Sequence, residues 1–122
     1  MTATFRFLEW EVYRDAKNLL ARILQIVRRL PPEYRFEIGS QIIRSALSIV
    51  LNIAEGSGKH SDRELNRFIE IALGSVNETL AATDILLDNQ LITKEEFKAL
   101  YENLESIAKQ LGGFKKKLAV SR

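Results

Sequence analysis

Apolar side chains recur at intervals of three and four residues along almost the whole chain, and this spacing constrains the fold more than any other feature. Near the start the positions are Val12, Ala16, Leu19, Ile23, Ile26 and Leu30. Near the end they are Phe97, Leu100, Leu104, Ile107, Leu111, Phe114 and Leu118. Such a repeat places one apolar stripe along a face of an α-helix. No segment shows the alternation typical of strands, so we predict an all-α protein.

Breaks in the pattern divide the chain into four expected helices, at about residues 8–30, 34–56, 62–88 and 94–118. Pro31-Pro32 stops the first, because proline lacks the backbone N–H and disfavours helix in the residue before it. Gly56-Ser57-Gly58 ends the second, where glycine would supply a left-handed cap. Ser61 to Glu64 and Thr93 to Glu96 have the spacing of capping boxes. Gly112-Gly113 predicts fraying of the last helix beyond that point.

The length and the connections favour one compact arrangement. A chain of 122 residues suits a single domain. Long helices with short connections pack antiparallel to their neighbours, so we predict an up-down-up-down four-helix bundle over residues 1–122. The chain has no cysteine, which excludes disulfides and thiol chemistry. No run approaches the ~18 apolar residues of a membrane span, and the first residues lack signal-peptide features. We therefore expect a cytoplasmic protein without membrane contact.

The second expected helix carries an unusual polar stripe, formed by Gln41, Ser45, Ser48, Asn52 and Glu55. Only Glu55 is charged, whereas a solvent face normally carries many charges. The third helix adds Ser75 within its apolar face and Glu78 at the border. We therefore predict a structural polar seam, buried between helices or between subunits, made of Ser45, Ser48, Asn52, Glu55, Ser75 and Glu78.

We find no sequence motif for catalysis or for metal binding, so we expect neither an enzyme nor a cofactor or metal. A di-metal site in a helical bundle needs Glu-x-x-His motifs, and His60 is the sole histidine. The serines of the seam have no histidine within predicted reach for a triad. Glu55 and Glu78 could approach as a carboxylate pair for acid–base chemistry, but the favoured interpretation is a structural role in the seam.

The net charge of +2 is distributed unevenly. Residues 61–108 carry four basic and ten acidic side chains, whereas residues 109–122 carry five basic and no acidic ones. The predicted topology gathers basic side chains at one end of the bundle: Arg6, Lys59, His60, Arg63, Arg67, Lys115, Lys116, Lys117 and Arg122. Such an end could contact phosphates, with an affinity that falls with salt. The alternative is that the lysines only complement the negative end of a helix.

The predicted nucleic-acid-binding residues are Lys59, Arg63, Arg67, Lys115, Lys116 and Lys117. We find no aromatic residue interleaved with them as single-strand stacking platforms require, so the expected binding follows the backbone of RNA or DNA and tolerates any sequence.

The second and third helices have apolar arcs of about 200°. A bundle member needs little more than about 100°. Surplus apolar surface usually marks an interface, so we predict homo-oligomerisation with closed symmetry. The alternative is that the extra side chains are scattered singly over the surface.

Two stretches resemble one known family. They are SIVLNIAEGSG at 48–58 and, after Glu64 and Phe68, IALGS at 71–75 with Glu78. Val12, Tyr13 and Ala16 and the prolines after the first helix fit the same pattern. The chain resembles the bacterial four-helix bundle proteins encoded in intervening sequences of large-subunit ribosomal RNA genes. The resemblance implies a homopentamer with a central channel. It also implies kinship to the accessory proteins of diversity-generating retroelements, which bind a reverse transcriptase and its RNA.

These observations together predict a non-enzymatic oligomeric scaffold that binds RNA or another nucleic acid through its basic end, with a reverse transcriptase as a further candidate partner. The alternative is a protein-binding or structural oligomer without nucleic-acid contact.

Overall fold

The computed structural model describes residues 3–120, and every regular element within them is helical. A short 3₁₀ segment, η1, precedes α1, and a single π-helical stretch, η2, joins the short α2 to α3. The elements are η1 (Ala3–Glu9), α1 (Glu11–Arg29), α2 (Pro32–Tyr34), η2 (Arg35–Gly39), α3 (Ser40–Ser57), α4 (Asp62–Asp88) and α5 (Lys94–Val120). The predicted all-helical class is confirmed for this part of the chain.

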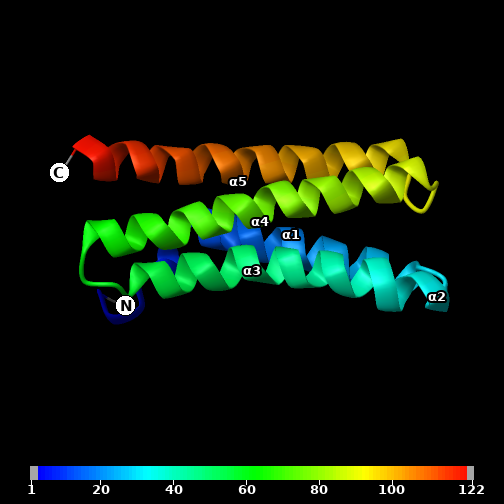
Figure 1. The fold of residues 1–122 in the computed structure, drawn as a ribbon, viewed down its shortest axis with the longest axis horizontal. Helices are drawn as coiled ribbons and strands as arrows, with labels where there is room; N and C mark the ends of the chain where they lie inside the picture. Colours follow the sequence, from blue (N-terminus) through cyan, green and yellow to red (C-terminus); the bar gives the residue numbers. More distant parts are fainter. Residues whose placement is uncertain (1–2, 121–122) are drawn as a thin grey trace.

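The long helices α1, α3, α4 and α5 lie side by side, and each runs opposite to the long helix before it (Figure 1). Around the bundle α1 packs on α3, α3 on α4, α4 on α5, and α5 again on α1. In this order α3 and α5 are diagonal to each other. Both ends of the chain lie at the same end of the bundle as the α3–α4 connection (Figure 1).

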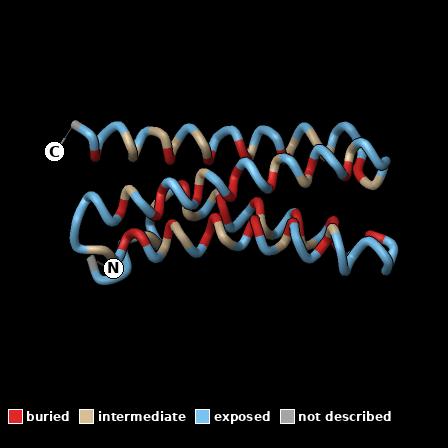
Figure 2. The backbone as a smooth tube through the Cα atoms, viewed as in Figure 1, coloured by how far each residue is buried: buried red, intermediate tan, exposed pale blue. Residues whose placement is uncertain are grey.

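The buried side chains form one contiguous core along the inward faces of these helices (Figure 2). Every residue of the predicted first stripe is buried, and on α5 Leu104 and Ile107 are at most 1% exposed. Each such Leu or Ile contributes about 1.5–3 kcal/mol of burial free energy, before the cost of ordering the chain. The core therefore follows the three-and-four spacing of the sequence.

Two helix ends differ from the sequence-based expectation. Helix α1 begins only at Glu11, because Trp10 is extended (φ −79°, ψ 132°). Helix α5 continues through Gly112-Gly113 to Val120, so the predicted fraying is wrong within the described residues. The ring of Phe114 packs against that of Trp10 at 5.0 Å between centroids, and Leu118 is buried. Tertiary packing here outweighs the low helix propensity of glycine.

Both predicted capping boxes form hydrogen bonds. The Ser61 hydroxyl accepts from the Glu64 backbone N–H at 3.1 Å. At the start of α5 the bonds are reciprocal: the Thr93 N–H donates to the Glu96 carboxylate at 2.9 Å, and the Glu96 N–H donates to the Thr93 hydroxyl at 3.0 Å. These local signals set where α4 and α5 begin.

The predicted left-handed glycine at the end of α3 is wrong. Gly58 has φ −89°, and no described glycine has a positive φ. Gly56 instead lies buried inside α3, where a Cβ atom would stand 2.8 Å from the Cβ of Phe68 on α4. The glycine therefore allows two helices to approach closely. The positive φ occurs at Gln90 (60°), in the turn between α4 and α5.

Candidate nucleic-acid interface

Three distant segments meet at the end of the bundle that carries both termini. The Arg6 Nε donates to the Ser57 carbonyl oxygen at 3.1 Å, which ties η1 to the end of α3. The Lys115 ammonium lies 3.3 Å from the Glu70 carboxylate, which ties α5 to α4. The bounds and antiparallel order of the helices thus place at this basic end the residues Arg6, Lys59, His60, Arg63, Arg67, Lys115, Lys116 and Lys117. Arg122, also expected here, lies outside the described residues.

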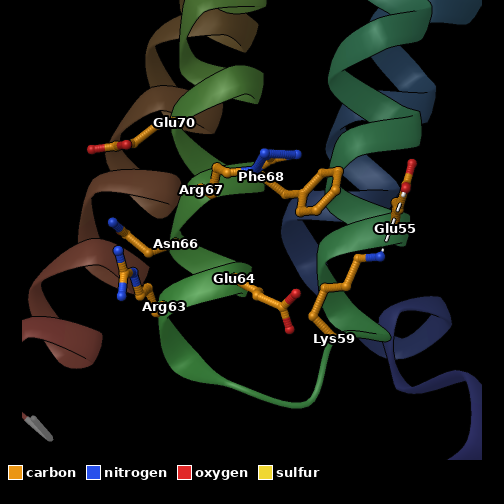
Figure 3. A pocket seen from close by; sticks show the side chains of 8 residues that line it. All are labelled: Glu55, Lys59, Arg63, Glu64, Asn66, Arg67, Phe68 and Glu70. Atoms are coloured by element: carbon orange, nitrogen blue, oxygen red, sulfur yellow. Dashed lines mark ion pairs between the residues drawn. The ribbon is translucent and has the colours of Figure 1, made fainter.

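A surface hollow of about 620 Å³ opens beside the first turns of α4 (Figure 3). It brings together three of the six predicted binding residues, Lys59, Arg63 and Arg67. Three carboxylates also line it, so the hollow is not purely cationic. Its full lining is Glu55, Lys59, Arg63, Glu64, Asn66, Arg67, Phe68 and Glu70.

The cations of this end differ in how far they are already engaged. Lys59 faces Glu55 at 3.9 Å, a solvent-exposed pair of the kind that contributes little. Neither Arg63 nor Arg67 forms an ion pair with another described side chain, and the same holds for Lys116 and Lys117. These four side chains are therefore the ones best able to meet an incoming phosphate.

Two aromatic rings lie among these cations, which sequence reasoning missed. The Lys59 Nζ stands 5.1 Å and the Arg67 guanidinium 5.2 Å from the centre of the Phe68 ring. The Arg6 guanidinium lies 5.3 Å from the Trp10 ring. Phe68 is only 9% exposed, so the ring positions cations through its π-face and offers no open stacking platform. The expectation of backbone-directed binding does not change.

The polar seam lies between α3 and α4 of one chain, which decides between the two locations left open by the sequence. The hydroxyls of Ser45 and Thr79 are 2.8 Å apart, and the Ser75 hydroxyl donates to that of Ser48 at 2.8 Å. Asn52 donates its side-chain amide to the Ser48 hydroxyl at 3.0 Å. Ser45 and Ser75 are buried, whereas Ser48 and Asn52 are half-buried. These four residues form an internal contact between two helices, whereas Glu55 and Glu78 are exposed, so the prediction that they are buried in the seam is wrong.

The two carboxylates predicted for the seam do not meet. Glu78 accepts from the Gln41 side-chain amide at 3.0 Å, whereas Glu55 faces Lys59 at 3.9 Å. Gln41 and Glu55 are fourteen residues apart on α3, which corresponds to about 20 Å along the helix. The register of α3 against α4 therefore separates Glu55 from Glu78, and the acid–base pair considered from the sequence is wrong.

Two buried hydroxyls extend the seam beyond the predicted residues. Thr79 and Thr83 are both 0% exposed. Each donates to the backbone carbonyl four residues earlier, Thr79 to Ser75 and Thr83 to Thr79, at 2.8 Å. The spacing of four from Ser75 to Thr79 to Thr83 was the available signal, because it keeps all three on one helix face.

We expect the double variant Ser45→Ala/Thr79→Val to unfold with a free energy within about 1 kcal/mol of the natural protein. Both partners of the buried contact become apolar together, and valine keeps the shape of threonine, so no polar group is orphaned. The measurement is urea unfolding followed by circular dichroism. A loss above about 2 kcal/mol would show that the seam is needed for stability.

The described residues contain no group of three or more His, Cys, Asp or Glu side chains placed to hold a metal ion. None of the helices in that part of the chain combines the length and hydropathy required to cross a membrane.

The fold and the basic end define the class of protein: an all-helical protein with a cationic end and a polar seam between the adjacent helices α3 and α4. The family model of the 23S rRNA-intervening sequence protein matches residues 9–113, and the chain belongs to that family.

A crystal structure of a protein with unknown function from the S23 ribosomal protein family of Bacteroides thetaiotaomicron is similar to this chain. The two share 27% sequence identity with a TM-score of 0.76, over 82% of this chain and 94% of the other. The search of curated proteins finds no match.

Proposed function

We propose that this protein is a non-enzymatic, self-associating helical scaffold that binds RNA or DNA through its basic end. The observation that carries the proposal is the set of cations there without an ion-pair partner among the described residues: Arg63, Arg67, Lys116 and Lys117. Guanidinium and ammonium groups of this kind bind phosphate oxygens and release counterions from the nucleic acid. The expected recognition is of the backbone, not of base sequence.

The family name links such proteins to ribosomal RNA genes, which makes structured RNA the first ligand to test. The finer form of the proposal is a cytoplasmic pentameric ring with a reverse transcriptase as protein partner. It rests on the resemblance of residues 48–58 and 71–78 to the intervening-sequence proteins, which implies a pentamer and a kinship to the accessory proteins of diversity-generating retroelements.

A second candidate function is a protein-binding or structural oligomer that makes no nucleic-acid contact. It is favoured by two exposed aromatic side chains in α2 and η2, away from the basic end: Phe36 is 85% exposed and Tyr34 is 40% exposed. Exposed aromatic residues are typical of the centres of protein interfaces.

The triple variant Lys115→Ala/Lys116→Ala/Lys117→Ala separates the two candidates. We expect about a tenfold loss of affinity for a labelled structured RNA at low salt. The slope of log K against log salt should also fall by about 0.7–0.9 for each phosphate contact removed. The measurement is fluorescence anisotropy over a salt series.

Lys98→Ala serves as the control, because Lys98 is exposed on the same helix but near its other end. It should leave both affinity and slope unchanged. If the triple variant binds with unaltered affinity and slope, the lysines are not the interface. If the natural protein shows no binding at low salt, the protein-binding candidate replaces this one.

A further inference from the structure

An apolar strip remains exposed on the outer side of α3. Leu47 and Leu51 are 38% and 54% exposed, and Ile43 and Ala54 beside them are half-buried. Their spacing of three and four places them on one helix face. Arg44 is exposed next to this strip and forms no ion pair with a described residue. We call Ile43, Leu47, Leu51 and Ala54 the α3 strip; these apolar side chains have one positive charge, Arg44, beside them.

An apolar groove runs between α4 and α5. Two hollows of about 310 Å³ and 120 Å³ share Asn77, Leu80 and Tyr101, and Tyr101 is 42% exposed. Two acidic side chains line it, Asp84 and Glu105, and neither pairs with a described cation. The remaining residues that line this α4–α5 groove are Val76, Ala81, Phe97, Leu104 and Ala108.

The strip and the groove lie at the same height along the bundle. The Ser75 hydroxyl donates to that of Ser48 at 2.8 Å, which places Leu47, next to Ser48, level with Val76 in the groove wall. The Ser45 to Thr79 contact at 2.8 Å likewise places Arg44 level with Leu80, about one helical turn before Asp84. Two copies standing side by side with parallel axes can therefore match apolar to apolar and positive to negative.

We infer that the α4–α5 groove takes a second copy of this chain: the α3 strip of one copy packs into the groove of the next, with Arg44 against Asp84 and Glu105. The inference rests on the self-association in the proposed function and specifies its two surfaces. Exposed apolar surface rimmed by charges is typical of protein interfaces, and the opposite charges fix the register.

The contact is heterologous, because the strip and the groove are different surfaces of one copy. Helices α3 and α5 are diagonal in the bundle, so the α3 strip of one copy cannot pack into the α4–α5 groove of the same copy. Each copy donates a strip and accepts one, an arrangement that produces rings or open filaments. Parallel copies carry their basic ends on the same side of the assembly. Several weak phosphate contacts then act together, which raises the overall affinity for a long nucleic acid.

Two single-face variants test the pairing by light scattering and sedimentation. Leu51→Glu places a negative charge in the α3 strip, and Ala81→Arg places a cation in the groove at the height where Arg44 of the next copy would lie. Both positions are exposed, so the bundle should fold. Each variant alone should run at the monomer mass of 13.9 kDa. An equimolar mixture should give pairs of one copy of each and nothing larger, because each chain retains one working face. Ile71→Glu, exposed on α4 outside the groove, is the control and should assemble like the natural protein.

Each alternative result overturns a different statement. If the natural protein is a monomer, self-association itself is wrong, whereas nucleic-acid binding is judged separately by the lysine variant. If the natural protein assembles and either single-face variant still assembles, the pairing of strip with groove is wrong. If both variants are monomers but their mixture forms no pairs, the contact is not heterologous.

The absence of natural cysteine allows a second test of parallel orientation. In Leu51→Cys/Ala108→Cys the two thiols lie at similar heights, Leu51 on the strip and Ala108 in the groove on the basic-end side. Mild oxidation should link chain to chain into a ladder on a non-reducing gel. Leu51→Cys/Phe97→Cys, with the second thiol at the far end of the groove, should stay unlinked. The reverse pattern would overturn the parallel arrangement.

Discussion

Replacing Gly56 with alanine is expected to lower the free energy of unfolding by about 1–3 kcal/mol, the range for forcing an extra methyl group into a packed contact. The added Cβ would lie 2.8 Å from the Phe68 Cβ and 3.1 Å from the Leu65 Cδ1. A side-chain end can move aside, but the Phe68 Cβ is fixed to the backbone of α4. Helices α3 and α4 would therefore have to separate where they pack.

The matched control is the same substitution at Gly113. Apart from its chain neighbours and the nearby backbone of its own helix, no atom lies within 4 Å of a Cβ built there, so the alanine meets open space. We expect Gly113→Ala to raise the stability by about 0.5–1 kcal/mol, because alanine has the higher helix propensity and restricts the unfolded chain. Both variants are measured by urea unfolding with circular dichroism. Changes of the same sign would show that the close approach at Gly56 does not determine the spacing of α3 and α4.

The spacing set by Gly56 also concerns the basic end. Phe68, which the added methyl group would displace, lies between Lys59 from the α3–α4 connection and Arg67 from α4. A glycine in the last turn of α3 thus links the packing of two helices to the position of two cations. The stretch at residues 48–58, which carries part of the family resemblance, includes this glycine.

Features encoded within one helix could be predicted from the sequence. The three-and-four spacing gave the buried face of α1 and α5, and the boxes at Ser61 and Thr93 gave the starts of α4 and α5. These signals act between residues at most four positions apart. The gathering of cations at one end followed from helix lengths and connections alone, because antiparallel order fixes which ends are neighbours.

Features that depend on how two helices face each other could not be predicted. Whether Glu55 lies near Glu78 depends on the register of α3 against α4. The apolar pattern of neither helix specifies that register, so the separation of the two carboxylates could not be predicted. The sequence does not distinguish a Gly56 that caps the end of α3 from a Gly56 that allows close contact with α4, because both roles place a glycine near a helix end. The contact of Lys59 with the Phe68 ring joins residues nine positions apart through the α3–α4 connection, and it depends on the directions of both side chains.

Reversing the charge of Arg63 and Arg67 together is expected to lower the affinity for structured RNA about a hundredfold at low salt. Arg63→Glu/Arg67→Glu removes two cations that no described carboxylate neutralises and puts repulsive charges in their place. Both positions are exposed in the first two turns of α4, and glutamate has a helix propensity similar to that of arginine, so the fold should persist. The measurement is fluorescence anisotropy, with circular dichroism to verify the helix content.

The double variant Lys94→Glu/Lys98→Glu is a matched control. It also replaces two exposed cations four residues apart in the first turns of a helix, and it shifts the net charge equally, from +2 to −2. Its site is the opposite end of the bundle, where α5 begins (Figure 1). We expect a loss of less than about threefold, because exposed charges separated by more than a Debye length are screened. Equal losses in the two variants would mean that nucleic acid responds to the total charge of the protein and not to a basic end. A large loss confined to Arg63 and Arg67 would assign the binding to the hollow beside α4, since the total charge is equal in both variants and all four positions are exposed near the start of a long helix.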